Sequence, residues 1–449
     1  SEDYLRELNP DARLGGRSPG CCPRGPAICG SDMMIKGNSL DNIRFGDSFT
    51  EDYLPGNIFD YMLANPPFGV KWEAERDFVK KEYDEQGFGG RFGAGLPRIN
   101  DGSFLFLQHM ISKMKPPEKG GTRLAIVFNA SPLFTGSAGS GESNIRRWII
   151  ENDWLEAIVA LPTDLFYNTG INTYIWIVTN RKEPHRKGKI QLIDVSSLFN
   201  KMRRSLGNKR NEISSEQIDE ITRLYGDFRK NKYVKILDNA DFGYQQITVE
   251  RPLKLNFAVT DERLARVKET NQFQRLAASK KRKDTTAAQK EIAKGQQLQI
   301  NILKALDILR SHGIIKNRKQ FTAKLRGAFK FAGLSIRASL FEAISMALAE
   351  RDEAADICTD KKGNPEPDPK LRDHENVPLK DDIDAYMARE VLPYVPDAWV
   401  DKNQTKIGYE INFNRYFYKY SPPRSLETIE ADLKQTEKDI DKKMLEMKV

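Results

Sequence analysis

The chain of 449 residues contains 39% hydrophobic and 30% charged residues, which allows two or three domains with ordinary cores. No run approaches the ~18 apolar residues that cross a bilayer, and no basic-then-apolar leader opens the chain. We therefore expect neither a membrane protein nor a secreted one. The formal charge of +8 and the pI near 9.0 mildly favour a polyanionic partner such as nucleic acid.

Cysteine usage indicates a reducing compartment. Cys21, Cys22, Cys29 and Cys358 are too few for a disulfide framework in a chain of this length, so we expect a cytoplasmic protein. The spacing of the first three does not match a usual zinc site, and no metal is expected.

The opening of the chain differs from the rest. It begins at Ser1 rather than at a methionine, which suggests a fragment, and residues 11–26 are crowded with Gly, Pro, Arg and Cys. This segment has neither a 2-residue nor a 3.6-residue apolar period, so we expect a disordered opening. A helix-like block follows at 27–37.

From there to residue 195, short apolar runs alternate with helical spacing. Such alternation predicts an α/β fold, a doubly wound and mostly parallel sheet with helices on both faces. Ligands of such sheets bind at the carboxyl ends of the strands, where Asp47 falls. A polar, Gly-rich connection at 70–95 is longer than ordinary loops, and such loops are usually functional or mobile. Strands are expected at 42–45, 59–64, 123–128, 156–161, 172–178 and 190–195, and helices at 104–114 and 144–151.

The pattern changes near residue 255. The basic run Lys280–Lys283 is typical of a solvated helix face, and amphipathic helices are predicted within 301–349. An aromatic cluster lies at 399–420. The charged helix predicted at 426–447 has Leu and Ile at heptad-like positions, so we expect it to pack on its own domain or on a partner. The expected parts are an opening at 1–26, a core at 27–255, a helical region at 256–358, a linker at 359–379 and a helical, aromatic docking segment at 380–449.

The segment most suggestive of chemistry is Asn65-Pro66-Pro67-Phe68, which follows an apolar run that we interpret as a buried strand. Two prolines fix φ twice and remove two N–H donors, so the segment predicts a rigid loop. The amide oxygen of Asn65 and the carbonyl of Pro66 can accept from an amino group, while Phe68 can stack on a flat ring. A plain strand-ending turn is the alternative, because Asn and Pro are favoured in turns.

These groups suit methylation of an amino-bearing heterocycle. The amino nitrogen of adenine is a poor nucleophile, because its lone pair is delocalised into the ring. Two acceptors that hold its protons favour an sp3 nitrogen and free the lone pair for attack on an electrophilic methyl group. No strong base is needed, since the proton can leave after the methyl arrives.

The tetrapeptide resembles the catalytic motif of amino-group DNA methyltransferases. Its surroundings are similar to the modification (methyltransferase) subunit of type I restriction-modification systems, in the N6-adenine DNA methyltransferase family. The resemblance covers most of the chain after residue 27. Its blocks are Ala27–Gly37, Asn42–Asp47, Phe59–Val70, Leu124–Phe134, Leu161–Val178 with Thr169–Thr173, Pro396–Trp399 and Lys406–Pro423.

The resemblance implies S-adenosyl-L-methionine as cofactor and methyl transfer to N6 of an adenine flipped out of double-stranded DNA. Asn65, Pro66, Pro67 and Phe68 would then be catalytic, with Asn65 also near the cofactor and Phe68 stacked on the base. The resemblance further implies that Asp47 and Glu7 bind the cofactor and that Phe166 forms a second wall of the base pocket. Each of these three has an alternative: turn chemistry for Asp47, a surface position for Glu7 and a core position for Phe166.

The sequence also departs from the family. The Gly-rich cofactor loop, normally Asp-Pro-Ala-Cys-Gly-Thr-Gly, is absent, as are the preceding helical domain and the first strand of the sheet. Residues 11–26 interrupt the expected passage from Glu7-Leu8-Asn9-Pro10 into the helix at 27–37. We therefore expect a truncated chain that binds S-adenosyl-L-methionine weakly or not at all.

The leading hypothesis is a site-specific adenine-N6 DNA methyltransferase. Its expected partners are double-stranded DNA, a specificity subunit, a second modification subunit and a restriction (nuclease) subunit. No DNA-reading motif of its own appears in the sequence, which fits a separate specificity subunit. The alternatives are a methyltransferase of RNA or of protein glutamine, and a catalytically dead remnant that acts only through partner binding.

Overall fold

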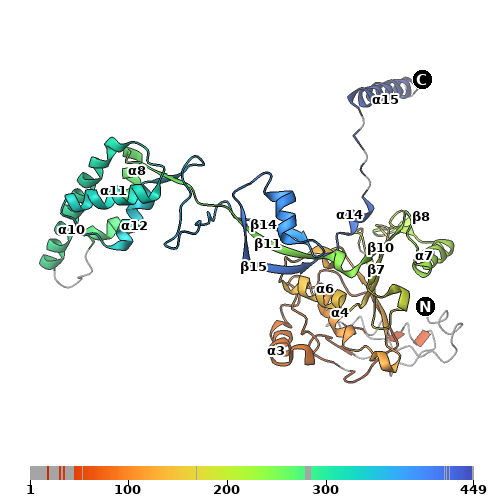
Figure 1. Ribbon diagram of the computed structural model, residues 1–449. Coiled ribbons are helices and arrows are strands. Elements are labelled where there is room, and N and C mark those ends of the chain that lie inside the picture. The colour runs from red at the N-terminus through yellow and green to blue at the C-terminus, as the bar shows by residue number, and fades with distance from the viewer. Residues whose placement is uncertain are drawn as a thin grey trace. The chain divides into compact units, whose positions relative to one another are not determined.

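The protein is described by a computed structural model that covers residues 18–19, 30–31, 34–35, 45–52, 54–167, 169–278, 285–418, 420, 422–423 and 425–446. Two compact units are present, one formed by Ser1–Gly243 with Gly408–Val449 and the other by Tyr244–Ile407 (Figure 1). The first unit is therefore discontinuous in sequence. Within the described ranges, no helix combines the length and the apolar character needed to cross a bilayer.

A six-stranded sheet forms the centre of the first unit. Its strand order is β10-β7-β5-β6-β4-β3. Pairs β3–β4 and β5–β7 are parallel, whereas β6 and β10 run against their neighbours. Four of the six strands consequently share one direction, and their carboxyl ends share one edge. The bounds are β3 Tyr61–Ala64, β4 Arg123–Phe128, β5 Leu155–Ala160, β6 Tyr174–Thr179, β7 Lys189–Asp194 and β10 Val234–Asp238.

Helices cover both faces of this sheet. Trp176 and Ile175 are neighbours on β6 and therefore point to opposite faces. The ring of Trp176 packs edge-on against Phe104 of α4, whereas Ile175 packs against the cluster that contains Leu224 of α7. The doubly wound α/β fold expected from the sequence is thus confirmed. The helices of this unit are α3 Arg76–Gln86, α4 Ser103–Ile111, α5 Ser131–Phe134, α6 Gly141–Glu151, α7 Ser215–Asp227, α14 Phe413–Phe417 and α15 Leu426–Glu446, with short 3-10 turns at η2 Gly87–Gly89, η3 Pro117–Lys119, η4 Pro184–Arg186 and η5 Asn239–Phe242.

Two local expectations need correction. The connection at 70–95 contains helix α3, which is docked by the fully buried Val79. The run that ends at Ala64 is not a buried strand, because Tyr61 and Leu63 of β3 are exposed. Strand β3 is the edge of the sheet in the described part of the chain, and its side chains alternate between exposed and half-buried. Two further pairs of strands are parallel β1 Ser18–Pro19 with β2 Phe45–Gly46, and antiparallel β8 Asn200–Leu206 with β9 Lys209–Glu212.

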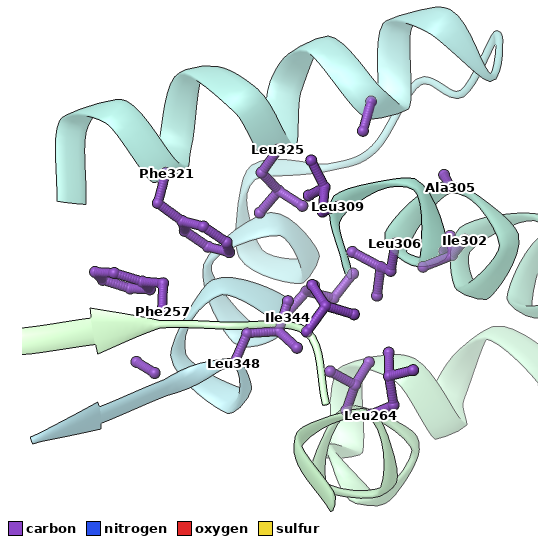
Figure 2. Packing of buried hydrophobic residues seen from close by; sticks show 14 of the residues in the cluster. Phe257, Leu264, Ile302, Ala305, Leu306, Leu309, Phe321, Leu325, Ile344 and Leu348 are labelled. Carbon is purple, nitrogen blue, oxygen red and sulfur yellow. The ribbon is translucent and has the colours of Figure 1, made fainter. Parts of the chain in front are cut away.

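The second unit combines a helical core with a small sheet. The aromatic rings of Phe257 and Phe321 are stacked at a centroid distance of 4.6 Å, and Leu306, Leu325 and Ile344 fill the space between the helices (Figure 2). The small sheet has the order β14-β11-β15. The bounds are β11 Gly243–Glu250, β12 Leu255–Phe257, β13 Ala349–Arg351, β14 Asp373–Pro378, β15 Trp399–Tyr409, α8 Asp261–Glu269, α9 Asn271–Gln274, η6 Arg275–Ala277, α10 Thr285–Asp307, η7 Ile308–His312, α11 Arg318–Phe331, α12 Ala338–Ala347, α13 Ile383–Tyr386 and the π-helical turn η8 Met387–Val391.

Candidate active site

The Asn-Pro-Pro-Phe turn lies at the carboxyl edge of the large sheet. Strand β3 ends at Ala64, which pairs with Ile126 of β4, so Asn65 continues beside the end of β4. Asn65 and Pro67 are exposed, Pro66 is buried and Phe68 is half-buried. The turn therefore presents its amide to solvent while Pro66 anchors it.

The chain on the far side of the turn is fixed as well. The carbonyl of Val70 accepts a hydrogen bond of 2.8 Å from the backbone N–H of Gly102, and the backbone N–H of Trp72 donates to Ile99. The indole of Trp72 is buried and donates to the carbonyl of Arg98 at 2.9 Å. The ladder of β3 on one side and these bonds on the other hold the tetrapeptide between two rigid supports.

Asp47 closes a turn directly after β2. One carboxylate oxygen accepts from the backbone N–H of Phe49 at 3.0 Å, and the other accepts from the hydroxyl of Thr50 at 3.2 Å. The turn chemistry considered for this residue is therefore present. Each oxygen keeps a further lone pair, and the residue is half-buried, so the carboxylate can still accept from a bound amino or hydroxyl group.

The other residues assigned from the sequence are not gathered around the turn. Glu7 lies outside the described residues, as do Cys21, Cys22, Cys29 and the run Lys280–Lys283. Phe166 is half-buried and packs against the cluster that contains Val159 and Leu224. Strands β6 and β4 separate β5 from β3, so about 14 Å lies between the ends of β5 and β3.

A polar network beside the turn was not predicted from the sequence. The buried carboxylate of Asp101 accepts from the hydroxyls of Ser103 at 2.6 Å and Ser131 at 2.8 Å, and Arg98 donates to Ser131 at 3.0 Å. Ser131 follows β4, and Asp101 precedes α4. The network therefore ties together two loops at the edge where Asn65 lies.

The C-terminal segment 408–417 returns to this same edge. Arg146 of α6 is fully buried and donates through Nε to the carbonyl of Tyr409 at 2.6 Å and through Nη1 to the carbonyl of Pro132 at 3.0 Å. The backbone N–H of Ile411 donates to the carbonyl of Leu133 at 2.8 Å. A single buried guanidinium thus joins the last part of the unit to the loop after β4.

The returning segment closes a cavity of about 310 Å³. Tyr174, the first residue of β6, lies in its floor, and its ring packs edge-on against Phe413 at 5.4 Å. Burial, and secondarily the charge of Asp194, raises the pKa of the Tyr174 hydroxyl. Strand pairing places Tyr174 opposite Phe128, at the end of β4. The lining residues are Ala130, Leu133, Phe134, Tyr174, Ile411, Asn412, Phe413, Asn414 and Arg415.

Comparison with protein families gives one match. The sequence model described as N-6 DNA Methylase matches residues 23–259, which is just over half of the chain. The matched range contains the whole six-stranded sheet and the Asn-Pro-Pro-Phe turn.

Individual relatives include methylase subunits of type I restriction enzymes. The MjaIX subunit of Methanocaldococcus jannaschii is 29% identical over 53% of this chain and 40% of its own length. The HindI subunit of Haemophilus influenzae is 33% identical over 38% of this chain and 35% of its own. The matched part of this chain therefore spans less than half the length of these two curated relatives. Among solved structures, the methyltransferase subunit of a type I restriction-modification system from Streptococcus thermophilus is 24% identical, with a TM-score of 0.42, over 51% of this chain and 45% of its own.

Proposed function

This chain belongs to the N-6 DNA methylase family, and from that premise we propose that it is the modification subunit of a type I restriction-modification complex. In this proposal it methylates N6 of an adenine flipped out of double-stranded DNA. The observation that carries the proposal is the exposed, doubly anchored Asn-Pro-Pro-Phe turn at the carboxyl edge of the sheet. A complex that modifies DNA would act in the cytoplasm.

The chain's own groups would activate the base. The side-chain oxygen of Asn65 and the carbonyl of Pro66 accept the two amino protons, which directs the nitrogen lone pair out of the ring plane. Phe68 stacks on the base and keeps it in the site. Because the loop is fixed on both sides, these acceptors need no rearrangement as the nitrogen attacks.

S-adenosyl-L-methionine would supply the electrophilic methyl group, carried on a sulfonium. The free lone pairs on the fixed carboxylate of Asp47 fit a hydrogen-bond donor of such a ligand. Asp47 would orient that ligand through its free acceptor sites, and Asn65 would lie between ligand and base. Glu7 keeps its proposed role as a cofactor contact, whereas the packing of Phe166 against the cluster that contains Leu224 favours the core position considered for it.

Helix α15 supports partner binding. Leu426, Leu433 and Ile440 recur every seven residues and are exposed, a spacing that forms one stripe on a helix. We assign this stripe to a helix of the specificity subunit or of a second modification subunit. Leu433→Ser with Ile440→Ser should abolish co-purification of that subunit, whereas Glu430→Ser on the same helix should not. Unchanged co-purification would refute the assignment.

Methyl transfer provides the direct test. The full chain, alone and with the specificity subunit of its own system, is incubated with radiolabelled S-adenosyl-L-methionine and, separately, plasmid DNA, ribosomal RNA or release factor. Because the sequence predicts weak binding of S-adenosyl-L-methionine, the labelled cofactor is supplied at high concentration, and any transfer is expected into DNA only, on N6 of adenine. Asn65→Ala should lower the rate by about 10²-fold, a typical cost for one group aimed at the reacting atoms.

Asn208→Ala provides the matched control, because Asn208 is an exposed amide at the turn between β8 and β9. Its rate should equal that of the unaltered chain. Label in RNA or in release factor would reassign the substrate class. No transfer under any condition, together with intact partner binding, would support the inactive remnant instead.

A further inference from the structure

The cavity beside the candidate active site is a nucleic-acid subsite, and we propose that it receives one nucleobase of the substrate strand while Arg415 contacts the adjoining phosphate. The proposal rests on the proposed DNA substrate and adds a site that the Asn-Pro-Pro-Phe turn does not include.

The lining of the cavity suits a flat aromatic ring. Its floor is apolar and buried, formed by Leu133, Tyr174, Ile411 and Phe413. Phe134 stands at the rim with 55% of its surface exposed, so one face of its ring is available for stacking. A volume of about 310 Å³ lies at the lower end of the range for small-ligand sites.

The rim adds the polar groups that a nucleotide needs. Asn414 brings an exposed side-chain amide, which can donate to and accept from the edge of any base. The amide nitrogen of Asn412 donates to the carboxylate of Glu410 at 2.7 Å, so Asn412 offers its oxygen as an acceptor. Arg415 is exposed and adds the cation, which matches the negative charge of a phosphate. Because stacking on an aromatic ring tolerates every base, this subsite would hold the strand without reading its sequence.

The position of the cavity links it to the reacting base. Ala130 of its lining follows β4, and Asn65 follows β3, and these two strands are neighbours at a spacing of about 4.8 Å, so both loops leave the same edge of the sheet. A strand whose adenine reaches Asn65 would therefore pass the cavity with a neighbouring nucleotide. We expect Arg146 to act as a positioning residue, because it holds the segment that carries Asn412, Asn414 and Arg415.

Oligonucleotide binding tests the proposal without methyl transfer. The full chain is titrated into a short fluorescein-labelled single-stranded DNA, and anisotropy gives the dissociation constant at several salt concentrations. Phe134→Ala should weaken binding about tenfold, as expected for loss of one base stack. Arg415→Gln should reduce the dependence of log Kd on log salt by about 0.7, the value for one phosphate on a single strand.

Two controls separate the subsite from general effects. Phe88→Ala and Arg223→Gln alter an exposed ring and an exposed guanidinium elsewhere on the same unit, and neither should change the affinity. With an oligonucleotide of abasic sugars, the unaltered chain and Phe134→Ala should bind equally, because no base remains to stack. Circular dichroism melting of each variant checks that it is folded.

Several results would overturn the proposal. Equal affinities for all variants, or no saturable binding by the unaltered chain, exclude a base in the cavity. Loss of partner co-purification on Phe134→Ala, with DNA affinity unchanged, would assign the cavity to a protein. None of these results depends on methyl transfer, so the methyl-transfer assay tests the proposed function independently.

Discussion

At the scale of single residues, Glu156 is the most consequential buried charge of the sheet. Its carboxylate is fully buried and accepts from Arg123 at 2.9 Å and from the hydroxyl of Tyr225 at 2.7 Å, with Arg186 at 3.8 Å. Burial, and then the charge of Glu156, raises the pKa of the Tyr225 hydroxyl. One carboxylate therefore joins β4, β5 and α7 at the edge opposite the candidate active site.

Removing this charge should cost stability. Glu156→Gln keeps the shape but leaves two guanidinium groups without their counter-charge, and we expect a loss of about 3 kcal/mol in the free energy of unfolding. Urea denaturation followed by circular dichroism measures the change. Glu220→Gln breaks an exposed pair on α7 and should alter stability little. Equal effects of the two substitutions would contradict this account.

Tyr409 makes the docking of segment 408–417 sensitive to alkali. Burial, and then the carboxylate of Glu151, raises the pKa of its hydroxyl from 10.0 to about 12. Because this pKa is higher in the folded state than in the unfolded state, the contribution of Tyr409 to the free energy of unfolding is complete below pH 10. It is lost as the pH rises toward 12. We expect protease cleavage within 408–417 to accelerate over that range.

The comparison that isolates this titration is Tyr409→Phe. The variant lacks the ionisable hydroxyl, so the part of the pH dependence that belongs to Tyr409 should disappear, whereas the other tyrosines titrate in both proteins. Identical pH profiles would show that Tyr409 does not control the segment.

At the scale of elements, helix α11 carries two phenylalanines in opposite situations. Phe321 is stacked on Phe257 (Figure 2) and is 1% exposed. Phe331 is 85% exposed. Phe321→Ala should lower the free energy of unfolding by about 3–5 kcal/mol, because it removes a large side chain and leaves a cavity. Phe331→Ala should change it little. Chemical denaturation of the full chain distinguishes the two.

Elements with a strong apolar pattern were predictable from the sequence. Residues 123–128 alternate half-buried and buried side chains, and the expected strand matches β4 at both ends. The hairpin β8–β9 was missed, because its residues are polar and mostly exposed and carry no apolar period. Its only local signal is the pair Gly207-Asn208, in which Gly207 adopts φ of +63°.

The candidate site was predictable only where the signal is local. The order of four residues was enough to single out the Asn65 turn, and the strand before it explains its place at the sheet edge. The cavity could not be predicted, because Tyr174 and Phe413 lie far apart in sequence and meet only through long-range packing. Arg146 gives no sequence signal either, since nothing local distinguishes a buried arginine from an exposed one.

At the scale of the whole molecule, the second unit is an insertion into the first. The backbone N–H of Glu410 donates to the carbonyl of Phe242 at 3.0 Å, so the chain leaves and re-enters the first unit at neighbouring points. Because these points are close together, the second unit can be removed and the chain rejoined without distorting the backbone of the first unit.

We therefore expect residues 244–407 to be dispensable for the folding of the first unit. Replacement of this range by a short Gly/Ser linker should give a protein that unfolds cooperatively in calorimetry. Its unfolding temperature should be close to that of one unfolding transition of the full chain. A matched deletion of 236–399 removes most of β10 and should fail to fold. Failure of both deletions would show that the first unit depends on the second.

The anchoring of segment 408–417 by Arg146 also has a consequence for biosynthesis. The sheet, the Asn65 turn and Arg146 itself are all translated long before the residues that complete the cavity. A ribosome-bound intermediate can therefore contain the complete sheet edge with the Asn65 turn before the cavity beside it has all of its lining residues. Nascent chains arrested before residue 408 would expose the guanidinium of Arg146, and the cavity would form only after segment 408–417 has been translated.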